Sequence, residues 1–111
     1  MKIDENMTFL DSSTQYLIRE KVEYLVRKIP NLEYVVLFGS YARMEQTVNS
    51  DIDLLVISSG MPDRLLRGDL CSEFEQENID LVFYDLNIFR ESDCLFISQI
   101  KKEGIILWRQ K

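Results

Sequence analysis

The chain has 111 residues, of which 46% are hydrophobic and 29% charged, and its formal net charge is −6. This composition is typical of one soluble globular domain spanning residues 1–111, and the negative charge disfavours a long nucleic acid as a partner. Because the chain has no histidine, catalytic triads, general bases and zinc sites built on histidine are excluded. No apolar run is long enough to span a bilayer and no signal peptide is evident, so we expect a cytoplasmic protein without membrane attachment.

Hydrophobic periodicity divides the chain into helices and strands. Helices are expected where apolar residues recur every turn, and strands where short runs of β-branched and aromatic residues end at turn formers. In chain order, the predicted elements are a helix at 11–29, strands at 32–39 and 51–58, a helix at 61–78, a strand at 79–85, a helix at 88–104 and an edge strand at 105–109. The link 40–50 is too short for a parallel crossover. We therefore predict an α/β (α+β) fold with a small mixed sheet of three to five strands flanked by helices.

Residues that favour helix ends mark the boundaries of the first two helices. Ser12 or Ser13 is placed to cap the first helix, and Pro30 is placed to end it. Pro62 is expected near the first position of the second helix, with Asp63 in its first turn.

Asp51 and Asp53 stand at the start of the second predicted strand. Side chains two positions apart on a strand point to the same face, so these carboxylates converge above the sheet while Ile52 and Leu54 face the core. Two like charges this close repel each other, unless one is protonated or a cation lies between them. Carboxylates suit Mg²⁺ or Mn²⁺, which predicts a metal site. The alternative is a solvated strand end whose carboxylates only cap loops.

Gly39 and Ser40 stand where the first strand ends and a short helix, 40–46, is expected to begin. Glycine lets the backbone approach a ligand, and a helix N-terminus together with the Ser40 hydroxyl offers donors to a phosphate. Asp80, near the start of the third strand, is the natural third carboxylate, whereas Asp85 is expected to cap the following helix. Carboxylates for metal and donors for phosphate are the parts that phosphoryl or nucleotidyl transfer requires.

These motifs resemble those of the minimal nucleotidyltransferases, small relatives of the DNA polymerase β superfamily. The family signature is Gly-Ser, then Asp-x-Asp, then a later Asp on a neighbouring strand. Here ten residues separate Gly-Ser at 39–40 from Asp-Ile-Asp at 51–53, and Asp80 takes the third place. The family commonly has glycine after Ala-Arg in the link, where this chain has Met44 after Ala-Arg at 42–43.

The resemblance implies a polymerase β-like palm sheet that binds ATP with a pair of Mg²⁺ ions and transfers AMP to an acceptor hydroxyl, releasing pyrophosphate. It also implies that Asp51, Asp53 and Asp80 hold the metals and act in catalysis, and that Gly39 and Ser40 hold the β- and γ-phosphates. Small members of the family are often antitoxins of HEPN/MNT toxin–antitoxin pairs, and attach AMP to a tyrosine of a HEPN-type RNase toxin. The implied partner is such a toxin, within a homo- or hetero-oligomer.

Some features have more than one interpretation. Arg43 is a candidate for nucleotide phosphate binding, or an ordinary surface arginine. The aromatic residues, among them Phe38, Tyr84 and Phe96, are expected in the core rather than as a platform for adenine. Two other functions stay open: nucleotidyl transfer to a small hydroxylated molecule such as an antibiotic, and a binding-only antitoxin that blocks its partner by occlusion.

Overall fold

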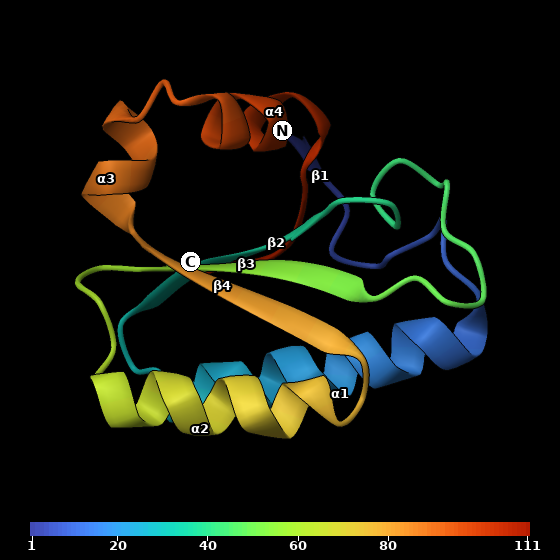
Figure 1. Ribbon diagram of the computed structural model, residues 1–111, viewed down its shortest axis with the longest axis horizontal. Coiled ribbons are helices and arrows are strands. Elements are labelled where there is room, and N and C mark those ends of the chain that lie inside the picture. The colour runs from blue at the N-terminus through green and yellow to red at the C-terminus, as the bar shows by residue number, and fades with distance from the viewer.

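The computed structural model describes all 111 residues as a mixed sheet with helices on both faces (Figure 1). In chain order the elements are β1 (Lys2–Ile3), α1 (Ser12–Lys28), β2 (Leu32–Phe38), β3 (Ile52–Ser58), α2 (Arg64–Glu75), β4 (Ile79–Asp85), α3 (Leu86–Glu91), α4 (Leu95–Glu103) and β5 (Ile105–Arg109). The five strands lie in the order β1-β5-β2-β3-β4. The predicted mixed α/β architecture is confirmed.

The central strand β3 has neighbours of both directions. It pairs antiparallel with β2 and parallel with β4. The antiparallel pairing follows from the short link between β2 and β3, whereas the parallel pairing uses α2 as the crossover. The mixed strand direction inferred from the link length is therefore present.

The strand β5 is an inner strand, not the edge strand that the sequence predicted. It pairs antiparallel with β2 and, on its other side, parallel with β1. Sequence reasoning missed β1 because its two residues, Lys2 and Ile3, are too few to show a strand pattern. The edges of the sheet are therefore β1 and β4.

The helices form two layers. Figure 1 shows α1 and α2 on one face of the sheet, and α3 and α4 on the other. The core that includes α1 and α2 contains 18 buried residues, and the core on the opposite face contains 7. β3 contributes Ile52 and Leu54 to the larger core, and Leu55 and Ile57 to the smaller one. Because side chains alternate along a strand, Asp53 lies on the face toward α3 and α4.

The helix α1 is capped by Asp11, and not by either of the two serines predicted for this role. The carboxylate of Asp11 accepts a hydrogen bond of 2.7 Å from the N–H of Thr14, so the cap is Asp11 rather than Ser12 or Ser13. The helix ends just before Pro30, as predicted.

The helix α2 begins later than predicted. It starts at Arg64, so Pro62 lies before the helix and Asp63 takes the N-cap position, where its side chain makes no capping hydrogen bond. Gly68 lies inside the helix with open space around it. None of the four helices combines the length and the apolarity that a membrane crossing needs.

The helix predicted at 88–104 is two helices. Ser92 has an extended backbone, with ψ of 134°, and ends α3. The ammonium group of Lys101 on α4 donates to the carbonyl oxygens of Arg90, at 3.3 Å, and Ser92, at 3.0 Å. Carbonyls at the end of α3 thus gain a partner, which stabilises the break. Asp85 caps α3, as predicted, by accepting hydrogen bonds from two backbone N–H groups of its first turn.

Candidate active site

Three side chains form a row across the sheet on the face toward α3 and α4. Strand pairing places Phe38 opposite Asp53, and Asp53 beside Asp80. Neighbouring strands lie about 4.8 Å apart, and these paired residues point to the same face. The structure therefore brings the carboxylates of Asp53 and Asp80 together.

This carboxylate row concentrates negative charge. Burial raises the pKa of the Asp53 carboxyl group, and the charges of Asp80 and Asp51 raise it further, whereas Arg43 lowers it. Asp51 lies just before β3 rather than within it, and is exposed, as is Asp80. Asp53 is thus the most buried of the three carboxylates. Its ionised form is disfavoured by its surroundings, and a bound cation would relieve the repulsion.

Gly39 lies directly against Asp53 where β2 ends. Its φ of +75° is in the left-handed region that favours glycine. A Cβ atom at this position would collide with Oδ2 of Asp53 and would lie 3.2 Å from Cγ. The Asp53 carboxylate therefore occupies its place only because residue 39 has no side chain.

The link after Gly39 is a series of turns, not the short helix predicted at 40–46. The N–H of Glu45 donates to the carbonyl oxygen of Ser40 at 2.9 Å. Met44 has a φ of +57°, which a right-handed helix does not allow. A side chain in this left-handed region costs about 1–2 kcal/mol. Methionine in place of the glycine that is common in the family therefore introduces strain.

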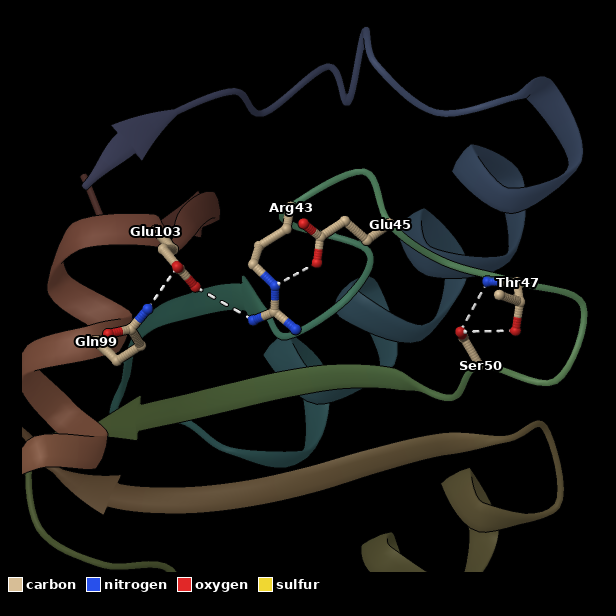
Figure 2. Close-up of polar contacts among 6 residues, drawn as sticks. All are labelled: Arg43, Glu45, Thr47, Ser50, Gln99 and Glu103. Carbon is tan, nitrogen blue, oxygen red and sulfur yellow. Dashed lines mark hydrogen bonds and ion pairs between the residues drawn. The ribbon is translucent and has the colours of Figure 1, made fainter.

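Arg43 lies between two carboxylates (Figure 2). Its Nε is 3.0 Å from an oxygen of Glu45 on the same loop, and its Nη1 is 3.2 Å from an oxygen of Glu103 on α4. Hydrogen bonds to Glu45 and then Glu103 raise the pKa of the guanidinium group. Gln99 donates to the other Glu103 oxygen at 2.5 Å. Sequence reasoning missed Glu103 because the pair joins positions 60 apart, with no local signal.

Two cavities open beside the carboxylate row. The larger, of about 430 Å³, is lined by Asp53 and Asp80 together with residues of β4, α2 and α4. The second, of about 230 Å³, lies at Gly39, Arg43 and α4. Phe38 and Phe96 line both cavities. The larger cavity reaches around the edge strand β4, because α2 lines it from one face of the sheet and α4 from the other.

The carboxylates suit a divalent cation but do not form a complete ligand set by themselves. No group of three or more His, Cys, Asp or Glu side chains is close enough together to hold a metal ion. Mg²⁺ is commonly bound by one or two carboxylates together with substrate phosphates and water. The pair Asp53 and Asp80, fixed by strand pairing, fits such a site. Asp51, just before β3, is exposed, and its charge adds to the negative charge at Asp53.

Comparison with known proteins identifies the family of the chain. The polymerase beta nucleotidyltransferase family matches residues 20–111. The chain is also 34% identical over 98 residues to the protein adenylyltransferase MntA of Shewanella oneidensis, which covers 85% of this chain and 67% of that protein.

Solved structures of toxin–antitoxin complexes are similar as well. A chain of a toxin–antitoxin crystal structure with AMP-PNP matches with a TM-score of 0.64 and 30% identity, over 83% of this chain and 73% of that one. A chain from the complex of a tri-AMPylated Shewanella oneidensis HEPN toxin with its MNT antitoxin matches with a TM-score of 0.58 and 28% identity, over 86% and 72%. The chain therefore belongs to the polymerase beta nucleotidyltransferase family and is a nucleotidyltransferase.

Proposed function

We propose that this chain is an antitoxin that transfers AMP from ATP to a tyrosine hydroxyl of a HEPN-type toxin. The relatives support this, because one is a protein adenylyltransferase and another comes from a complex with an AMPylated HEPN toxin. A complex with AMP-PNP, an ATP analogue, supports ATP as the substrate. Within this chain, the proposal is carried by the adjacent carboxylates of Asp53 and Asp80, with Gly39 packed against Asp53.

In the proposed reaction, the tyrosine oxygen attacks the α-phosphorus of ATP. A bond forms between that oxygen and phosphorus, the bond to the bridging oxygen breaks, and pyrophosphate leaves. N–H groups of the turn after Gly39 and the Ser40 hydroxyl would bind the β- and γ-phosphates. Asp53 and Asp80 would hold Mg²⁺ together with phosphate oxygens, and Asp51, just before β3, is proposed as a further ligand; the ion would neutralise phosphate charge when bound. Asp80, exposed on an edge strand, would face the acceptor and favour loss of its proton.

Arg43 is proposed as a further phosphate contact. The guanidinium group has several N–H donors, and Glu45 and Glu103 engage its Nε and Nη1. Other N–H groups therefore stay available for a phosphate oxygen. Arg43 also lines the smaller cavity together with Gly39, which lies against Asp53.

Transfer of label from α-labelled ATP tests the proposal. With Mg²⁺ and the proposed HEPN-type toxin partner, the wild-type chain should label a tyrosine of that toxin, located by mass spectrometry. Asp53→Asn and Asp80→Asn should each reduce labelling by about a hundredfold or more. Asp63→Asn is the matched control, because Asp63 is exposed, makes no capping hydrogen bond and lies outside the site.

Two results would contradict the proposal. The first is that the wild-type chain transfers label neither to the toxin nor to itself. The second is that Asp53→Asn labels the toxin as fully as the wild-type chain does. Neutralisation of the toxin by Asp53→Asn without labelling would instead support a binding-only antitoxin.

We also propose that residues 1–111 act as one domain, because the carboxylates, Gly39 and α4 belong to one sheet-and-helix unit.

A further inference from the structure

Phe96 is a large aromatic side chain left partly exposed beside the proposed nucleotide site. It belongs to α4, and 42% of the residue is exposed. It lines the larger cavity together with Asp53 and Asp80, and the smaller cavity together with Gly39 and Arg43. Phe96 therefore borders both the carboxylate row and the turn after β2.

Two aromatic side chains of the sheet support the ring of Phe96. Phe38, at the end of β2, meets it edge-to-face with 5.6 Å between ring centroids and an interplanar angle of 89°. Tyr84 on β4 is stacked with it at 6.3 Å and 29°. Because both supports come from strands, the ring is held in place before any ligand binds, which lowers the entropy cost of binding.

We propose that Phe96 is the platform on which the base of the bound nucleotide stacks. This inference rests on the proposed function, because it assumes a triphosphate at the turn after Gly39. Whichever of the two cavities takes the base, Phe96 borders it. Every nucleobase has an aromatic face, so stacking on a phenyl ring adds affinity that triphosphate alone does not have.

The role of Phe96 differs from the core position expected from the sequence. Packing into the smaller core does not require the exposed part of the ring, and Phe96 is not among the buried residues of that core. The preceding residue, Leu95, is 85% exposed and lines neither cavity. Leu95 therefore provides a matched control for the loss of apolar surface on the same helix.

Calorimetric titration of the intact chain with AMP-PNP and with inorganic tripolyphosphate, both with Mg²⁺, tests the inference. Phe96→Leu keeps the apolar bulk and removes the aromatic face, so it should weaken AMP-PNP binding by about tenfold and leave tripolyphosphate binding unchanged. Phe96→Tyr keeps the aromatic face and should bind AMP-PNP as the wild-type chain does. Leu95→Ala should change neither affinity.

Several outcomes would overturn the inference. Unchanged AMP-PNP binding by a folded Phe96→Leu variant would overturn it. Labelling of the toxin by the same variant would still support the proposed function. Equal weakening for AMP-PNP and tripolyphosphate would also overturn it, because the effect would then act on the phosphate end. Normal AMP-PNP binding with loss of toxin labelling would make Phe96 a toxin contact instead. A wild-type chain that binds no AMP-PNP would end both proposals.

Discussion

Gly39→Ala should destabilise the protein more than Gly60→Ala, although both glycines have a positive φ, of +75° and +86°. Alanine in the left-handed region costs about 1–2 kcal/mol, and the reduced entropy of the unfolded chain offsets about 0.4–1 kcal/mol. A Cβ atom at position 60 would meet nothing nearer than Nδ2 of Asn31, at 3.8 Å. Gly60→Ala should therefore cost about 1 kcal/mol, from conformation alone.

At position 39, a collision adds to the same conformational cost. The new methyl group would meet the Asp53 carboxylate, whose Cγ lies 3.2 Å from the Cβ position, so the carboxylate must move. Forcing extra volume into a packed position typically costs about 1–3 kcal/mol. We therefore expect Gly39→Ala to cost about 2–4 kcal/mol in total. For a domain of this size that lowers the melting temperature by about 8–16 °C.

Guanidinium unfolding in EDTA, followed by circular dichroism, measures both costs. The decisive comparison is a double-mutant cycle with Asp53→Ala, which removes the carboxylate that the methyl group meets. In that background the cost of Gly39→Ala should fall to about 1 kcal/mol, the value expected for Gly60→Ala. An unchanged cost of Gly39→Ala in the Asp53→Ala background would refute the reasoning, because the destabilisation would then come from the backbone alone.

Three further substitutions test the same description of the chain. Met44→Gly should stabilise the protein by about 0.5 kcal/mol, because the relief of left-handed strain exceeds the effect of the entropy that glycine adds to the unfolded chain. Chemical denaturation measures this change, and a loss of stability would contradict it. Gly68→Ala should raise stability by about 1 kcal/mol, since a Cβ there has open space inside a helix, and an unchanged melting temperature would count against it. Burial raises the pKa of Asp53 in the folded protein, so the ionised carboxylate destabilises the metal-free fold. Stability should therefore fall as the pH rises from the ordinary aspartate pKa of about 3.9 through the raised pKa of the folded protein. Asp53→Asn should remove this fall, and parallel pH profiles of melting temperature for the two proteins would disprove the effect.

The strands that carry the site were predictable from local pattern. The apolar runs at 32–39 and 51–58 end at residues that turn the chain, so the predicted and observed bounds of β2 and β3 agree to within a residue. The two-residue spacing of the aspartates gave the correct face for Asp53, because alternation is a property of the strand itself. The choice of Asp80 over Asp85 rested on its place near the start of the strand, on the capping role expected of Asp85 and on the family resemblance.

Features that depend on distant parts of the chain were not predictable. β5 is an inner strand only because Lys2 and Ile3 pair with it, which its own apolar run does not reveal. The pair of Arg43 and Glu103 depends on where α4 lies against the loop. The exposure of Phe96 depends on the same placement. Side-chain pattern gives the face of an element, whereas its neighbours are set by the packing of the whole fold.

The two faces of the sheet bury different numbers of apolar side chains, so the two parts of the site should differ in local stability. The layer of α3 and α4 rests on 7 buried residues, against 18 on the opposite face. Local unfolding begins where fewest apolar side chains are buried, so amide hydrogens of α4 should exchange faster than those of β3. Asp53 and Asp80 belong to strands of the sheet, whereas Phe96 and Glu103 belong to α4. A nucleotide that contacts both layers would stabilise α4 against local unfolding, so exchange of the α4 amide hydrogens should slow when it binds.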